Sequence, residues 1–212
     1  MNLKDVLVLL IYLKNRLSYK LSLLPVISIG AFAGISAEMC LLIMFQSYYG
    51  YVYSGISLLT AAFMAGAAAG CGFMNRKTAG ILKRSLKLTI LFESLYLILL
   101  PWFFSAFYLF NDKTSSLIIT NLFFPLLTVI PGYFSGAIYT LSSKITIDSY
   151  ENEFEKDKKA FLPYLMDIVG AALGAVLSAA VLLPVLGIIN ICLILSFSLL
   201  LCLLIAFIYD KK

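Results

Sequence analysis

Long apolar runs alternate with short polar segments along the whole chain. Six runs are long enough for helices that cross a bilayer, and they cover residues 24–46, 54–74, 87–109, 116–142, 161–186 and 188–209. The first would be about 35 Å long at the usual helical rise, which is enough to cross with some tilt. The pattern therefore predicts an all-α, polytopic membrane domain of six transmembrane helices over residues 24–212.

Composition and charge agree with this class and add an orientation. The chain is 62% hydrophobic and 13% charged, which is too apolar for a soluble domain. Fifteen of the 16 Lys and Arg residues precede the first helix, follow the second and fourth, or end the chain, and Lys113 is the exception. We expect a multi-pass protein of the cell's inner (plasma) membrane, and the positive-inside rule places both of its termini in the cytoplasm. The net charge of +5 reflects this sidedness, so nucleic acid is not an expected partner.

The segments outside the helices have simpler interpretations. Residues 1–23 are basic and their apolar core, Val6 to Leu13, is too short to span, so we expect an interfacial cytoplasmic helix, with a frayed tail as the alternative. Residues 143–160 are rich in both charges and predict a solvated loop or a docking surface. The chain has no histidine, and its four cysteines form no C-x-x-C pair. These absences argue against histidine metal sites and thiol exchange, and we expect no cofactor.

Small residues recur at steps of four in four of the predicted helices. This spacing places them on one helix face and lets helix backbones approach closely in lipid. We expect helix packing at Gly30, Gly34, Gly66, Gly70, Gly132, Gly136, Gly170 and Gly174. Two acids share faces with these glycines: Glu38 in the first helix and Asp167 in the fifth. Each should therefore face protein, because an unpaired charge near the bilayer centre costs at least about 2.5–3.5 kcal/mol.

Further polar and helix-breaking residues stand out in the apolar runs. Gln46 and Glu93 join Glu38 and Asp167 as candidates for ligand binding or proton coupling. The alternative for Glu93 is that it pairs with Lys87 or Arg84, or reaches the membrane interface. The tyrosine-rich turn over 47–53 is typical of an aromatic belt, with a cation-stacking surface as the alternative. A Pro-Gly pair at 131–132 predicts a bend or break in the fourth helix. Pro184 and Gly187 predict the turn into the sixth.

Two similarities link the halves of the chain. Gly30 to Gly34 corresponds to Gly132 to Gly136, and Gly66 to Gly70 corresponds to Gly170 to Gly174. The offsets are 102 and 104 residues, and three helices separate each pair, so the copies run in opposite directions. We expect an inverted 3+3 repeat, as in each half of a major facilitator transporter. Such a six-helix half is open to pairing with a second copy as a homodimer.

Glu38 with the following LLIMFQSYYGYVYSGISLLTAAFMAGAAAG, and later MDIVGAALGAVLSAAVLLPVLGI, resemble the membrane domain of bacterial spermidine synthase-like integral membrane proteins. In that family a major facilitator-like region is often fused to a polyamine synthase domain. The resemblance covers most of residues 26–190. The chain has no glycine-rich strand-turn-helix pattern for a nucleoside cofactor, so the aminopropyl-transfer residues have nothing to match. The resemblance thus implies the membrane part without the synthase domain, and no enzymatic activity.

Two hypotheses about function follow. In the first, the chain is a transport-type module whose acids Glu38 and Asp167 face a central cavity and bind a proton or a small, polyamine-like cation. In the second, it is a non-transporting scaffold that anchors a separately encoded, spermidine synthase-like cytoplasmic enzyme. Binding of polyamines, or co-purification of such an enzyme, distinguishes the two.

Overall fold

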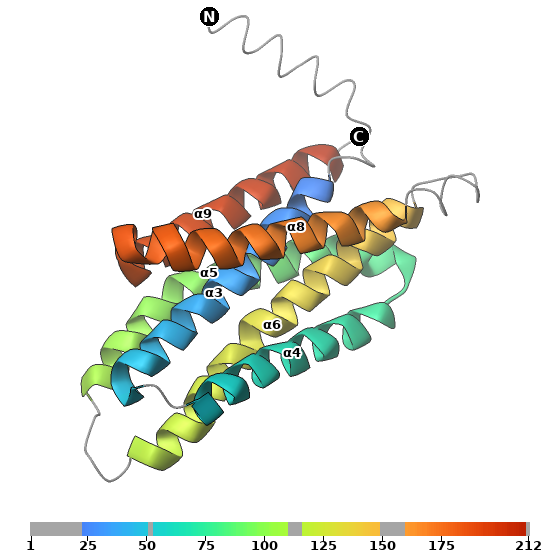
Figure 1. The fold of residues 1–212 in the computed structure, drawn as a ribbon. Coiled ribbons are helices and arrows are strands. Elements are labelled where there is room, and N and C mark those ends of the chain that lie inside the picture. Colours follow the sequence, from blue (N-terminus) through green and yellow to red (C-terminus); the bar gives the residue numbers. More distant parts are fainter. Residues whose placement is uncertain (1–22, 51–52, 110–115, 149–159, 211–212) are drawn as a thin grey trace, which may run out of the picture.

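The computed structural model describes residues 23–50, 53–109, 116–148 and 160–210, which form a bundle of long helices (Figure 1). The all-α prediction is confirmed for these residues. The helices are α3 (Leu24–Tyr49), α4 (Tyr53–Asn75), α5 (Ala79–Leu109), α6 (Ser116–Asp148), α8 (Phe161–Leu177), the π-helical segment η1 (Ser178–Leu182) and α9 (Leu183–Asp210). The interfacial segment expected before residue 23 and the charged residues 149–159 lie outside the described residues.

Five stretches of the described residues are long and apolar enough to cross a membrane, which agrees with a multi-pass membrane protein. They are Leu24–Ser47, Tyr53–Asn75, Gly80–Ser105, Leu122–Asp148 and Phe161–Leu204. The last is 44 residues long. A straight helix of that length would measure about 66 Å, roughly twice the thickness of the hydrocarbon core.

This longest stretch is interrupted where the sequence predicts a turn. Gly187 leaves helical geometry with φ 74° and ψ 166° inside α9. Glycine adopts this positive φ without the steric cost that a Cβ would bring. Just before it, η1 places the Leu183 N–H on the Ser178 carbonyl, five residues back. The expected turn at Gly187 is confirmed.

Three boundaries or shapes differ from the sequence-based expectations. The third helix begins at Ala79, eight residues before the expected start, because Leu82 and Leu86 are buried although basic residues surround them. The fourth helix continues to Asp148, so residues 143–148 are not loop. It is also unbroken at Pro131, where the sequence predicted a bend or break.

A hydrogen bond from a neighbouring helix explains how α6 tolerates Pro131. Proline lacks the N–H that would bond the carbonyl four residues back, which is that of Leu127. The Tyr96 hydroxyl on α5 donates to this carbonyl at 2.9 Å. A buried carbonyl in an apolar bundle is costly unless it is bonded, and Tyr96 meets that need.

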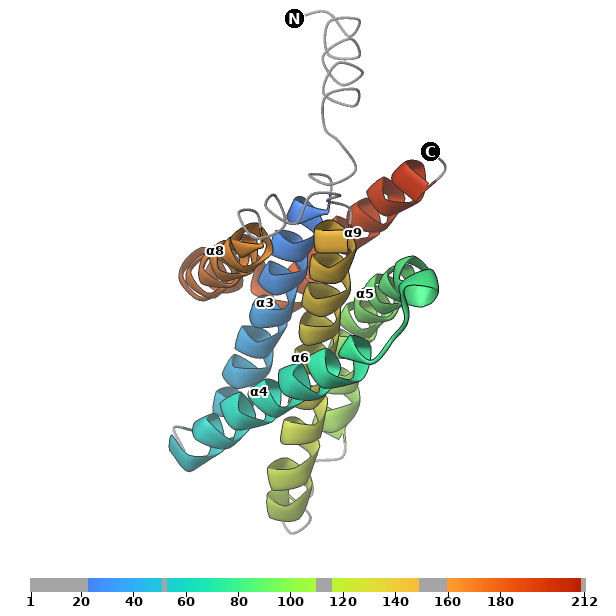
Figure 2. The same cartoon turned by 90° about the vertical axis from the view of Figure 1, so that its right-hand side faces the viewer.

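The helices form three layers (Figure 2). α3 and α6 lie in the middle, α4 and α8 lie on one side of them, and α5 and α9 lie together on the other. α4 packs mainly on α6, and α8 packs mainly on α3. Consecutive helices alternate in direction, so the end of α4 lies beside the end of α6, where the Lys144 ammonium donates to the Asn75 carbonyl (Figure 1).

The predicted packing role of the α4 and α6 glycines is visible in their contacts. A Cβ at Gly66 or Gly70 would overlap the carbonyls of Val129 and Tyr133 on α6. The contact is reciprocal, because a Cβ at Gly132 or Gly136 would overlap backbone carbonyls of α4. The two backbones therefore touch, and only glycine permits this approach.

The other glycines pack in two different ways. Gly170 and Gly174 on α8 bring that helix against the carbonyls of Ser28 and Phe32 on α3. Gly30 and Gly34 on α3 instead lie under side chains of α6, those of Ile138 and Ser135. The α3–α8 crossing thus has glycine on one helix only.

Candidate functional site

A cavity lies between α3, α4, α6 and α8, and it has a volume of about 310 Å³. Most of its lining is apolar or aromatic, and its polar side chains come from three of the four helices. The lining residues that matter below are Ala31, Ile35, Phe63, Ser135, Tyr139, Tyr164 and Asp167. The volume is at the lower end of the range of about 300–1,000 Å³ that is typical of small-molecule sites.

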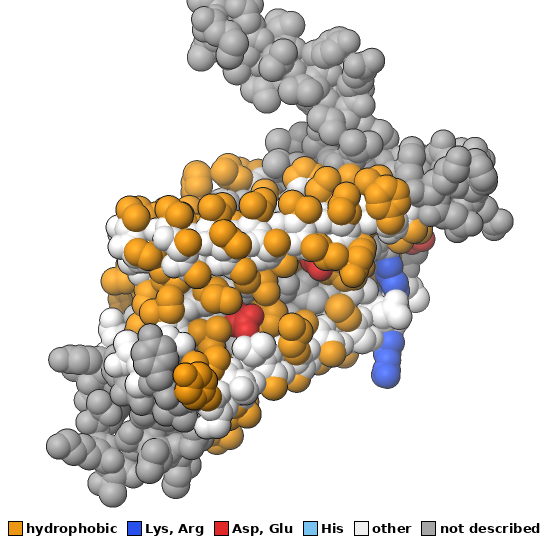
Figure 3. Space-filling view, in the orientation of Figure 1, with side chains coloured by type: hydrophobic (Ala, Val, Ile, Leu, Met, Phe, Trp, Pro, Cys, Tyr) orange, Lys and Arg blue, Asp and Glu red, His pale blue; other side chains and the backbone are white. Residues whose placement is uncertain are grey.

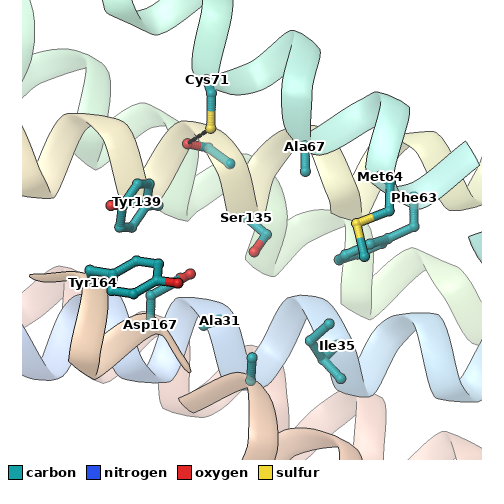
Figure 4. A pocket seen from close by; sticks show the side chains of 12 residues that line it. Ala31, Ile35, Phe63, Met64, Ala67, Cys71, Ser135, Tyr139, Tyr164 and Asp167 are labelled. Atoms are coloured by element: carbon teal, nitrogen blue, oxygen red, sulfur yellow. Dashed lines mark hydrogen bonds between the residues drawn. The ribbon is translucent and has the colours of Figure 1, made fainter. Parts of the chain in front are cut away.

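Asp167 is the acid that lines this cavity. Figure 4 shows Asp167 and Tyr164 together on α8, with Tyr139 facing them from α6. Tyr139 and Asp167 are close enough to interact electrostatically. Asp167 is half-buried, and it lies six residues into α8. The arrangement is one carboxylate beside two phenols at one end of an apolar cavity.

The aromatic side chains suit a cation with an organic body. Ring faces attract cations, and Tyr139, Tyr164 and Phe63 all line the cavity. A carboxylate supplies the opposite charge. Among the described residues no group of three or more His, Cys, Asp or Glu side chains comes together, so the geometry does not indicate a metal centre.

Glu38 is placed differently from the expectation that both acids share one cavity. It is 4% exposed, but it is not among the cavity-lining residues. Its carboxyl lies within hydrogen-bonding reach of the Thr60 side chain on α4. The expectation that Glu38 faces protein is confirmed, and the structure separates it from the cavity of Asp167.

Glu93 and Gln46 also lie outside the cavity lining. Gln46 is half-buried near the end of α3. Glu93 is 1% exposed, and neither of its carboxylate oxygens has a hydrogen-bond partner among the described residues. The expected pairing with Lys87 or Arg84 is therefore not observed. At 1% exposure Glu93 lies inside the bundle and not on its outer surface.

Buried hydroxyls join neighbouring helices at two points. The Ser178 hydroxyl donates to that of Ser36 at 2.6 Å, linking η1 to α3. The Ser94 and Ser196 hydroxyls lie 2.8 Å apart and link α5 to α9. These bonds satisfy polar groups inside an apolar bundle, so they are accounted for as packing.

Sequence reasoning missed the tyrosines of the site. Tyr139 and Tyr164 lie near the ends of apolar runs, where tyrosine usually belongs to the interface belt. Their spacing from Asp167 offers a partial signal, because Tyr164 precedes it by three residues and so shares its helix face. Tyr139 is on another helix, and no local pattern reveals a contact of that kind.

The face of the bundle seen in Figure 3 is mainly hydrophobic, with a few isolated acidic side chains and with Lys and Arg side chains at its right-hand edge. Such a surface agrees with the lipid-facing surface of a multi-pass membrane protein. Comparison of the chain with models of known families, with curated proteins and with solved structures finds no match.

Proposed function

We propose that this chain is a six-crossing membrane module built from an inverted 3+3 repeat, which binds or moves a small organic cation at Asp167. The Gly187 break supports the count of six, because it divides the 44-residue stretch into two lengths that each suit one crossing. Under the proposal the basic ends of α4, α5 and α6 face the cytoplasm, since Arg76, Lys83 and Lys144 lie there.

The glycine contacts support the repeat. Gly170 and Gly174 on α8 follow Gly66 and Gly70 on α4 by 104 residues. The first pair meets the carbonyls of Ser28 and Phe32 on α3, and the second pair meets those of Val129 and Tyr133 on α6. These carbonyls differ by 101 residues in both cases. Ser94 and Ser196 are 102 residues apart and touch each other. Contacts related in this way are expected if α3, α4 and α5 correspond to α6, α8 and α9 about a two-fold axis between them.

One observation carries the proposed activity: a carboxylate within a membrane-spanning stretch lines a cavity whose other walls are apolar and aromatic. Intramembrane acids that face a cavity are characteristic of substrate and ion pathways. A polyamine is the cation class that the resemblance to spermidine synthase-like membrane proteins suggests. The repeat arrangement, with the cavity at the interface of the halves, is typical of transporters.

The first experiment is binding of putrescine and spermidine to the purified protein in lipid nanodiscs, measured by calorimetry. Asp167→Asn removes the charge and keeps the shape, so we expect binding to fall at least tenfold. Glu38→Gln is the matched control, because it makes the same kind of change at a buried acid outside the cavity. Binding that is lost in Glu38→Gln and kept in Asp167→Asn would contradict the assignment.

The alternative is a membrane scaffold for a separate cytoplasmic enzyme. It is favoured by Glu38, whose contact with Thr60 gives that acid a structural role between α3 and α4. If neither polyamine binds the wild-type protein, the scaffold becomes the better hypothesis. Its test is co-purification of a soluble, spermidine synthase-like protein in mild detergent.

A further inference from the structure

Glu93 is the most deeply buried acid of the described residues. It is 1% exposed and sits within the buried stripe of α5 that includes Ile90 and Leu97, both 0% exposed. This stripe packs against α9. Both carboxylate oxygens lack a protein hydrogen-bond partner among the described residues, so no donor or cation of the bundle offsets a negative charge there.

The titratable groups around Glu93 are thiols and a phenol. From α9, Cys202 is close enough to interact electrostatically with it. On α5 itself Tyr96 lies near by, with its hydroxyl committed to the Leu127 carbonyl of α6. The thiols of Cys40 on α3 and Cys192 on α9 flank Tyr96. An environment of this kind accommodates a neutral carboxylic acid far better than a carboxylate.

The other half of the bundle shows that packing alone does not require an acid here. Ser94 and Ser196 face each other across α5 and α9, and the residues just before them are Glu93 and Leu195. Leu195 is 3% exposed, so it occupies an equally buried place. Leu195 on α9 and Glu93 on α5 therefore occupy corresponding, equally buried positions, one with an apolar side chain and the other with an acid.

We propose that Glu93 is a proton-binding site: a neutral acid between α5 and α9 that exchanges its proton with water when the two helices separate. The ligand is a proton, not a metal cation, since no group of three or more His, Cys, Asp or Glu side chains comes together among the described residues. The site is distinct from the Asp167 cavity, because Glu93 does not line it. The proposal therefore stands or fails independently of polyamine binding.

The test is infrared spectroscopy of the full-length protein in liposomes, using the carbonyl band of neutral carboxylic acids. We expect this band in the wild type at neutral pH, a shift of the band in ²H₂O, and its loss as the pH is raised. Glu93→Gln should remove it. Glu38→Gln, which removes the other acid with under 5% exposure, should leave it in place.

Two results would overturn the proposal. A neutral-pH spectrum with no band that depends on Glu93 would mean that the acid is ionised and paired in some other way. A band that ignores both ²H₂O and alkaline pH would mean a permanently closed, structural acid. If Glu93→Gln does not fold, Glu93→Leu, which copies Leu195, provides the same difference spectrum.

Discussion

The two glycine crossings of the bundle, α4 on α6 and α3 on α8, both use glycines four residues apart, and they differ in closeness at one end. In the first, glycines stand on both helices and both backbones touch. In the second, the glycines stand on α8 alone: a Cβ at Gly170 would overlap the Ser28 carbonyl as closely as one at Gly66 overlaps that of Val129, but there is more room at Gly174, so the crossing is looser at that end. The carbonyl contacts are related by 101 residues, one fewer than the sequence match of Gly30 and Gly34 with Gly132 and Gly136, so the α3 positions that correspond to these α6 glycines are Ala31 and Ile35.

The difference bears on the site, because Ala31 and Ile35 both line the cavity that also holds Asp167. A helix with side chains at these positions cannot admit its neighbour as closely as one with glycines. The closed crossing therefore serves as scaffold, and the looser one borders the space where a ligand would bind. Among the side chains that line the cavity, α8 contributes an acid, Asp167, and α4 contributes Phe63.

The largest expected effect is at the closed crossing. Gly66→Val places a side chain on the Val129 carbonyl, so it should cost at least about 1–3 kcal/mol and separate α4 from α6. Gly72→Val is the matched control, because it lies on the same helix with nothing within 4 Å of an added Cβ. Thermal denaturation of the two variants in detergent, followed by circular dichroism, makes the comparison. Equal melting temperatures would contradict the close approach of the backbones.

A smaller effect is expected at the looser crossing, and it should be graded along α8. An added Cβ at Gly170 crowds the carbonyl, carbon and Cα of Ser28, whereas at Gly174 it has more room beside Phe32. Gly170→Ala should therefore lower the melting temperature more than Gly174→Ala. The reverse order would show that the crossing is tightest nearer the C-terminal end of α8.

These crossings also show how far sequence carries. The glycine spacing identified the residues that pack, since a step of four defines a helix face. It did not reveal that α4 meets α6 while α8 meets α3, because partner choice depends on the whole bundle. The early start of α5 was missed since Lys83 and Arg84 resemble a loop, although Leu82 and Leu86 continue the buried stripe.

The candidate site, too, could be predicted from the sequence only in part. Asp167 and Glu38 were both identifiable as buried acids in apolar helices, but only one of them lines the cavity. Whether an acid meets a cavity or a threonine depends on side chains from other helices. No spacing within one helix reports such a contact.

An intermediate effect is expected at Pro131 of α6, the helix that takes part in the closed crossing with α4. Tyr96→Phe leaves the Leu127 carbonyl without its donor, at a cost of about 0.6–2 kcal/mol. Adding Pro131→Ala restores a backbone N–H that can bond the same carbonyl, so the double variant should recover most of the loss. Melting temperatures of the two single variants and the double variant test this. A double variant less stable than Tyr96→Phe would reject the compensation.

The smallest effect is expected at the looser crossing of α3 and α8, where a buried hydrogen bond adds to the glycine contacts. The Ser178 hydroxyl begins the π-helical segment and donates to Ser36, 2.6 Å away on α3. In a double-mutant cycle of Ser36→Ala and Ser178→Ala, we expect a coupling of about 0.6 kcal/mol, the average for such bonds between membrane helices. Additive single effects would mean that each hydroxyl has another partner once the first is removed. A coupling well above this value would mean that the bond, more than Gly170 and Gly174, holds α8 on α3.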